Sequence, residues 1–203
     1  MPLKVLALNC TLKRSPAPSS TDRLLGELLA ALESHDARGG IVRVADLDIK
    51  PGVSSDEGEG DDWPALRRRV VACDILVIGS PIWLGQPSSV AKRVLERLDA
   101  FLGEKDERGR MPSYGKVAVV AAVGNEDGAH HVHAEVAQAL NEVGFTIPAG
   151  GATYWVGEAM QSTNYLDLAT TPKALAAWTP MLASNAAHLA RLLEATPYPG
   201  RSQ

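Results

Sequence analysis

The chain has 203 residues, of which 45% are hydrophobic, and its formal net charge is −4. This length and composition suit one sizeable core, so we expect a single α/β domain over residues 1–203. The charge excludes the basic surface that nucleic-acid binding requires. No apolar run reaches the length of about 18 residues that would predict a membrane span.

The two cysteines, Cys10 and Cys73, are too few for a disulfide framework or a zinc site. No secretory leader pattern follows Met1. We therefore expect a cytoplasmic protein with reduced thiols.

A strand, a polar loop and a helix follow one another between residues 4 and 33. The apolar run 5–9 predicts the strand, and leucines at helical spacing behind Ser20 and Thr21 as caps predict the helix. The loop between them, residues 10–21, carries five hydroxyls and two cations. Hydroxyls, cations and the free amides of a helix start are the groups that bind a phosphate monoester. A plain serine- and proline-rich connection is the alternative interpretation.

The next part of the chain predicts a strand, a long loop, a helix and a strand. Gly39 and Gly40 are expected to end the first helix, and the β-branched segment 41–46 to form the second strand. The acidic segment 47–62 predicts an exposed, mobile loop. Asp62 is expected to cap a helix that runs to about residue 72, with the arginines 67–69 on its solvated face. The apolar run 74–79 predicts a strand buried on both faces.

The second half continues the alternation. A loop over 80–87, a helix capped by Ser88, a strand over 116–122, a loop over 123–128 and a helix over 129–143 are expected. The fifth strand is expected in two pieces, 145–148 and 153–156, with a bend at Gly150 and Gly151. A long final helix begins after Thr171 and Pro172. Its expected buried stripe consists of Leu175, Trp178, Leu182, Leu189 and Leu192.

Five strands that alternate with helices predict a doubly wound parallel sheet in a three-layer α/β/α arrangement. Ligands of such sheets bind beyond the carboxyl ends of the strands. The loops after the first, third and fourth strands all have unusual composition, which favours one site built by the three.

The second and third loops carry groups suited to a flat ring. Trp83 stands between Pro81 and Gly85, and could lie against a ring face, although a core tryptophan is the alternative. Gly124 and Gly128 would let the main chain approach, while Asn125 and Asp127 could bond the ring edge. An ordinary tight turn explains the third loop equally well. A phosphate site with a flat ring beside it describes a mononucleotide.

Three histidines, His130, His131 and His133, open the helix after the third loop. Neighbouring side chains on a helix diverge by about 100°, so a metal site is not favoured. A hydrogen bond from one of them to the ring edge is the better interpretation. No Gly-x-Gly-x-x-Gly or Walker A motif is present, which argues against a dinucleotide fold or a P-loop.

Together, the hydroxyl-rich first loop, the segment 80–85 with Lys92 and Asp99 in the following helix, and the Gly-Asn-Glu-Asp-Gly loop resemble the flavodoxin-like NAD(P)H-dependent FMN reductase family. The resemblance covers about residues 3–155. It implies a flavodoxin-like sheet of order 2-1-3-4-5, FMN as cofactor and NAD(P)H as co-substrate. The cofactor-binding residues it implies are Thr11, Lys13, Ser19, Ser20 and Thr21 for the phosphate, Pro81, Ile82, Trp83, Leu84 and Gly85 for the ring, and Gly124, Asn125, Asp127 and Gly128 for its polar edge. Among the three histidines at the same rim, His131 is the candidate for a further bond to the ring edge.

Two features depart from the family pattern. The first loop carries extra residues at 15–18, so which hydroxyls touch the phosphate stays open. The segment 47–62 is where an iron–sulfur branch of the family holds its cluster cysteines, and it contains none, so we exclude the cluster.

The leading hypothesis is an oxidoreductase that takes hydride from NAD(P)H and reduces a small acceptor such as a quinone or free flavin. The flavin supplies the chemistry, so no catalytic side chain is expected. The alternatives are an electron carrier that docks protein partners, and a flavin-binding module without turnover. The weak net charge argues against the strongly acidic docking face of a carrier.

Large apolar side chains gather after the fifth strand, in residues 154–165. Aromatic residues and Met are enriched in the cores of protein interfaces. We therefore expect a homodimer with the flavin near the interface. A monomer whose segment folds back on the final helix is the alternative.

Overall fold

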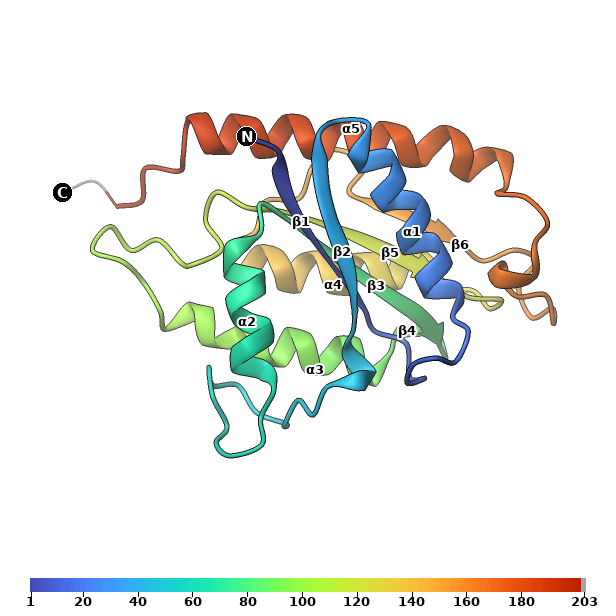
Figure 1. The fold of residues 1–203 in the computed structure, drawn as a ribbon, viewed down its shortest axis with the longest axis horizontal. Coiled ribbons are helices and arrows are strands. Elements are labelled where there is room, and N and C mark those ends of the chain that lie inside the picture. The colour runs from blue at the N-terminus through green and yellow to red at the C-terminus, as the bar shows by residue number, and fades with distance from the viewer. Residues whose placement is uncertain (202–203) are drawn as a thin grey trace.

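The computed structural model describes residues 1–201 and contains one central parallel sheet (Figure 1). Its strands are β1 (Leu3–Asn9), β2 (Ala37–Arg43), β3 (Ile75–Trp83), β5 (Val117–Val123) and β6 (Ala152–Trp155), in the order β2-β1-β3-β5-β6. A two-residue strand, β4 (Gln86–Pro87), pairs antiparallel with the end of β3. If the short β4 is left out, β5 and β6 are the fourth and fifth strands and the order is the flavodoxin-like 2-1-3-4-5. The predicted fold is therefore confirmed.

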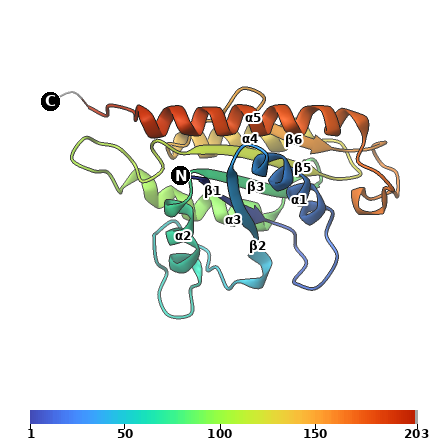
Figure 2. The same cartoon turned by 45° about the horizontal axis from the view of Figure 1, so that its top comes forward.

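Helices cover both faces of the sheet (Figure 2). α1 (Ser20–Glu33) and α5 (Lys173–Ala195) pack on one face, and α2 (Trp63–Ala72), α3 (Ser89–Leu98) and α4 (Ala129–Glu142) pack on the other. Three 3₁₀ turns, Val44–Asp46, Asp99–Leu102 and Tyr165–Asp167, lie in the connections. Side chains of a strand alternate between its faces, so Leu6 and Leu8 join one core cluster while Val5 and Ala7 join the other.

The second strand begins earlier than the sequence pattern indicates. Gly39 and Gly40 lie inside β2, so the prediction that they end the first helix is wrong. The chain turns instead at Asp36, whose φ is +54°. Gly39 is needed inside the strand because a Cβ there would lie 1.7 Å from the carbonyl oxygen of Val5 on the neighbouring strand.

The third strand runs through the expected loop. β3 continues to Trp83, and the chain reverses at Leu84 and Gly85, whose φ values are +53° and +74°. Positive φ at both central residues is the geometry of a tight hairpin turn. The loop predicted over 80–87 is therefore mostly a β-hairpin.

The fifth strand and the final helix also differ in detail from expectation. β6 has four residues, and the earlier segment contributes only a bridge between Thr146 and Val117. On α5, Trp178 and Leu192 are exposed rather than buried. Beside buried leucines, four small side chains occupy the face of α5 that packs on the sheet. They are Ala183, Ala186, Ala187 and Ala190.

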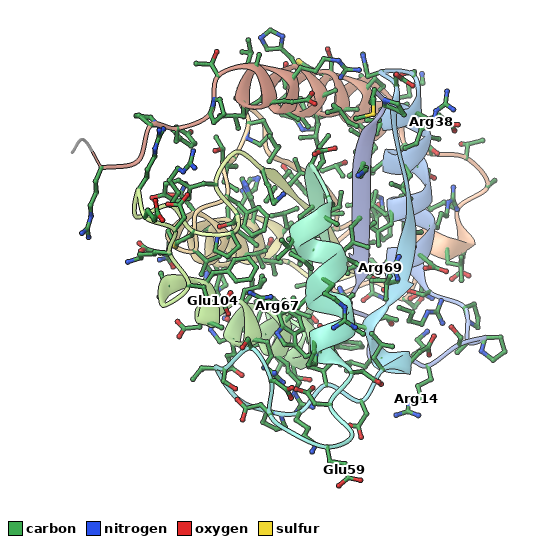
Figure 3. The ribbon with its side chains drawn as sticks, turned by 60° about the vertical axis from the view of Figure 1, so that its left-hand side comes forward. Arg14, Arg38, Glu59, Arg67, Arg69 and Glu104 are labelled. Atoms are coloured by element: carbon green, nitrogen blue, oxygen red, sulfur yellow. The ribbon has the colours of Figure 1, made fainter. Side chains whose placement is uncertain are left out.

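The acidic segment 47–62 is anchored to the core by one buried arginine. Arg97 of α3 is fully buried and donates to the carbonyl oxygens of Lys50 (2.9 Å) and Ser54 (3.1 Å) and to the Asp61 carboxylate (2.7 Å). Many of its residues are exposed as predicted, among them Glu59, which points outward (Figure 3), but the backbone of the segment is fixed to α3.

The start of α2 is capped differently from the prediction. Asp62 precedes the helix, but its carboxylate accepts from the backbone N–H of Asp48, and Asp61 accepts from that of Trp63. Arg68 and Arg69 are exposed as predicted, but Arg67 is only partly exposed, because it pairs with Glu104 (Figure 3) and lies over the Phe101 ring. No helix in the described residues is long and apolar enough to cross a membrane.

Candidate functional site

A cavity of about 120 Å³ lies where β1, β3 and β5 end, as the strand-end argument predicts. Ten of the fifteen predicted cofactor-binding residues line it. They are Thr11, Lys13, Ser19, Ser20, Thr21, Pro81, Ile82, Trp83, Gly124 and Asn125. A larger cavity of about 570 Å³ is lined by residues at the opposite end of the sheet and contains none of the fifteen.

The first loop is shaped by buried Asn9 at the end of β1. Its side-chain oxygen accepts from the N–H of Thr11 (3.0 Å), and its amide donates to Asp22 on α1 (2.7 Å). The hydroxyl of Ser88, which caps α3 as predicted, donates to the carbonyl oxygen of Cys10 (2.6 Å). The loop is thus fixed to the sheet, to α1 and to α3 before any ligand binds.

The cap of α1 is Ser19 rather than Ser20 and Thr21. The backbone of Ser19 is extended and its Oγ accepts from the N–H of Asp22 (3.3 Å). Ser20 and Thr21 occupy the first helical turn, where N–H groups have no partner within the helix. Within the described residues neither N–H donates to another group. The helix start therefore offers two free amides to the cavity.

Hydroxyls and one cation complete this donor set. The side chains of Thr11, Thr21 and Lys13 line the cavity together with Ser20, whose Oγ accepts from the N–H of Leu166 (3.2 Å). The ammonium of Lys13 donates to the carbonyl oxygen of Pro18 (3.0 Å), which folds it back over the loop. Two free amides, hydroxyls and an ammonium at a helix start suit a phosphate dianion, so the residues fit the phosphate of FMN.

Trp83 stands at the rim of the cavity with 51% of its surface exposed, and it belongs to neither core cluster. The residue before it, Ile82, is buried, because alternate side chains of β3 face the core. The exposed position of Trp83 leaves its indole free to lie against a bound ring.

Part of the third loop, residues 123–128, contacts the hairpin turn after β3 instead of lining the cavity. A Cβ on Gly128 would lie 2.6 Å from the Cα of Gly85, so these two glycines let the backbones touch. The Asp127 carboxylate accepts from the N–H of Gly128, and Glu126 accepts from the N–H of Leu84. Leu84, Gly85, Asp127 and Gly128 thus join the two loops and do not line the cavity. Gly124 does line it, and a Cβ there would meet Ile82 at 2.9 Å.

The histidines lie outside the cavity. The Nε2 of His131 is 3.0 Å from the side-chain oxygen of Gln86, and His130 is 2.8 Å from the hydroxyl of Tyr154. The structure does not bring His131 to the cavity. Among the described residues no group of three or more potential ligands is arranged for a metal ion.

Two lining residues, Asn164 and Tyr165, lie in a segment that the sequence analysis assigned to an interface. Tyr165 is fully buried and packs against Trp155, with ring centroids 5.3 Å apart. Its hydroxyl donates to Glu27, and Arg23 donates to the carbonyl oxygens of Tyr165 (2.9 Å) and Leu168 (2.7 Å). The aromatic residues of this segment were the available signal, but spacing could not show that they fold onto α1.

We call residues 157–168 the strap, because they pass from the end of β6 to the start of α1. At one end the N–H of Met160 donates to the carbonyl oxygen of Asn125 (2.7 Å), and at the other Leu166 donates to Ser20. The strap therefore joins the third loop to the first loop beside the cavity. Met160 is 85% exposed there.

A flavodoxin-like sheet with a phosphate-binding donor set at the end of its first strand defines a class of flavin-binding α/β proteins. The chain belongs to the NADPH-dependent FMN reductase family, whose model matches residues 3–161. The resemblance drawn from the sequence is confirmed. Membership implies FMN as cofactor and NAD(P)H as co-substrate.

Two curated relatives match the chain. The 8-demethyl-8-aminoriboflavin-5'-phosphate synthase of Streptomyces davaonensis is 36% identical over 212 residues, covering 98% of this chain and 81% of that protein. The divalent metal cation transporter MntH of Mycobacterium bovis is 42% identical over 169 residues. That match covers 81% of this chain but 25% of the transporter, so this chain spans about a quarter of that relative's length.

Solved structures agree with the family. RosB with the bound intermediate 8-demethyl-8-formylriboflavin-5'-phosphate has a TM-score of 0.87 and 34% identity, over 97% of this chain and 82% of that one. An apo NADH:FMN oxidoreductase has a TM-score of 0.67 and 19% identity, over 98% of this chain and 94% of that one, which supports the fold alone.

Proposed function

We propose that the protein is an FMN-dependent oxidoreductase that accepts hydride from NAD(P)H and reduces a small acceptor such as a quinone or free flavin. The observation that carries the proposal is the convergence of ten predicted residues on one cavity at the strand ends. Bound FMN would supply the redox chemistry through its ring.

The residues of this chain would bind and orient the cofactor. A cavity of about 120 Å³ is smaller than the roughly 300 to 1,000 Å³ of a full ligand pocket, so it suits the phosphate end of FMN and part of the ring. The rest of the ring would lie on the open rim, beside exposed Trp83 and close to Gly124 and Asn125. An open rim leaves one ring face free for a nicotinamide and then for an acceptor.

Anaerobic reduction tests this function. We expect NADH or NADPH to bleach the flavin absorbance of the purified holoprotein within seconds to minutes, and a quinone to restore it. Dithionite serves as the control for a flavin that can be reduced. A flavin that dithionite bleaches but neither nucleotide does would support the electron carrier and contradict the reductase.

A second candidate function follows from the relative in S. davaonensis, which is similar over nearly the whole of this chain. In this case FMN would be the substrate, and the change at position 8 would require an external oxidant such as oxygen and an amino donor. Mass spectrometry of the flavin extracted after incubation with oxygen, an amino donor and NAD(P)H separates the candidates: unchanged FMN supports the reductase, and a changed mass supports the modifying enzyme.

Trp83 gives a prediction about the rim. Because its side chain is half exposed and outside both core clusters, Trp83→Ala is expected to leave the melting temperature of the apoprotein nearly unchanged while weakening flavin binding or shifting its potential. Thermal unfolding and flavin titration measure the two effects. A loss of about 3 to 5 kcal/mol of unfolding free energy, as for a core aromatic residue, would show that Trp83 is structural instead.

The homodimer stays a prediction. Tyr165 and Trp155, which contributed to it, are satisfied within their own chain. The large apolar side chains that stay exposed on the hairpin and strap, and that a second subunit could cover, are Trp83, Leu84, Met160 and Leu166.

A further inference from the structure

A second cavity, of about 470 Å³, lies beside β6, the edge strand of the sheet. Its walls come from the start of α4, from β6 and the residues before it, and from the start of α5, which meet at this edge (Figure 1). It shares no lining residue with the cavity at the strand ends. Its volume falls within the roughly 300 to 1,000 Å³ that small-molecule sites occupy.

The walls of this cavity are aromatic and held in place by hydrogen bonds. Trp178 donates from its indole N–H to the carbonyl oxygen of Ala152 (2.8 Å), although 43% of its surface is exposed. The ring of Tyr154 meets that of His130 edge to face at 5.0 Å, and the two side chains share a hydrogen bond of 2.8 Å. Leu175 adds an apolar wall. Because the rings are fixed without a ligand, a flat molecule would find the site already formed.

The charge and polarity of the walls restrict the ligand further. No Asp, Glu, Lys or Arg is among the described residues that line the cavity, so nothing there would compensate a charged ligand. Burial, followed by the charge of His130, lowers the pKa of His133, which favours a neutral imidazole at pH 7. A neutral imidazole has one donor and one acceptor nitrogen.

His133 has an unsatisfied polar atom. Its Nε2 is buried and has no hydrogen-bond partner among the described residues, and the same side chain lines the cavity. A buried polar group without a partner destabilises the folded state. A turn of the imidazole that brought this nitrogen to the cavity wall would let a ligand oxygen bond it and remove that cost.

We propose that this cavity is a second binding site, separate from the flavin, for a neutral flat aromatic molecule that carries a hydroxyl or carbonyl oxygen. Trp178, Tyr154 and Leu175 contact the faces and edge of the ring system, and His133 bonds the oxygen. The site does not depend on the reductase reaction, because none of its residues lines the cavity at the strand ends.

The test uses the FMN-loaded protein and 2-naphthol as the probe, titrated by calorimetry. Ala174, an exposed lining residue of α5, is replaced by tryptophan to fill the cavity. Ala177→Trp, at an exposed position on the same helix outside the lining, is the matched control. We expect Ala174→Trp to weaken 2-naphthol binding at least tenfold, and Ala177→Trp to change it less than twofold, with flavin content unchanged in both.

A second variant tests the oxygen contact. The wild-type protein is expected to bind 2-naphthol more tightly than naphthalene, and His133→Phe, which keeps a ring of similar shape, is expected to abolish that preference. Equal 2-naphthol affinity in Ala174→Trp and the wild type, or no binding at millimolar probe, would overturn the proposal. A sedimenting mass for Ala174→Trp that is half that of the wild type would also overturn the proposal. It would show that a second copy of the chain covers this cavity in the wild-type protein.

Discussion

Arg97→Ala is expected to lower the free energy of unfolding by about 3 to 5 kcal/mol, the cost of removing one partner from a buried ion pair. The guanidinium of Arg97 and the carboxylate of Asp61 are both fully buried, with a separation of 2.7 Å. Arg97 also donates to two loop carbonyl oxygens and lies 5.5 Å from the ring centroid of Trp63. The variant would leave an unpaired buried charge and two unsatisfied carbonyl groups.

Urea unfolding followed by far-UV circular dichroism measures this loss. Arg93→Ala is the matched control, because Arg93 lies one turn earlier on α3, is exposed, and makes a single hydrogen bond to the carbonyl oxygen of Ile49. We expect the control to change stability by less than about 1 kcal/mol. A similarly small change in Arg97→Ala would show that the segment 47–62 is not anchored through this pair.

The same pair predicts a dependence of stability on pH. Burial opposes ionisation of Asp61, but the hydrogen bonds from Arg97 and from the N–H groups of Glu57, Trp63 and Lys50 outweigh it and hold the pKa well below its usual range. A lowered pKa in the folded state adds stability above the ordinary aspartate pKa of about 4, and that stability is lost as pH falls toward the folded value. The free energy of unfolding, measured at a series of pH values from 7 to 3, should therefore fall less steeply with pH for Arg97→Ala than for the wild type.

Local patterns predicted the layers of the fold because each buried strand carries its own signal. β5 is seven apolar residues that are all buried, and its neighbours in the sheet follow from the doubly wound order. Gly39 shows where the pattern is insufficient. In the sequence, a glycine pair after a helix usually marks the end of that helix. Glycine is needed at position 39 for another reason, because pairing of β1 with β2 brings the backbone of Val5 close to it.

The anchoring of the acidic segment had no local signal. Arg97 lies 36 residues from Asp61 and stands in a helix whose pattern gives an arginine no distinct role. Nothing in the sequence around residues 47–62 shows that one guanidinium will bond two of its carbonyl groups. Such contacts depend on how helix and loop pack together.

The cavity residues were predictable to the extent that each loop follows directly from a strand. Pro81 lies in β3 and pairs with Val123, and Gly124 follows Val123 directly. Thr11 comes two residues after Asn9, which pairs with Gly79 of β3, so the sheet itself brings the three together. Asn164 and Tyr165 reach the cavity from a distant segment through the contacts of Arg23 and Glu27. That arrangement requires the tertiary structure.

The double variant Ser20→Ala, Thr21→Ala is expected to weaken FMN binding far more than riboflavin binding. Hydrogen bonds to a charged group contribute about 1.5 to 3 kcal/mol each, so losing two corresponds to a loss of roughly 10²- to 10⁴-fold in FMN affinity. Riboflavin lacks the phosphate and should lose little. Because Ser19 caps α1 and stays in place, and alanine favours helix, the variant should keep the helix start.

Fluorescence titration of the apoprotein with each flavin measures the two affinities. Ser34→Ala, at the opposite end of α1, is the control and should leave both unchanged. Ser20 also accepts a hydrogen bond from the strap, so a loosened strap would weaken both flavins alike. Equal losses for FMN and riboflavin would show that these hydroxyls do not hold the phosphate, whereas a loss confined to FMN would assign it to the hydroxyls of Ser20 and Thr21.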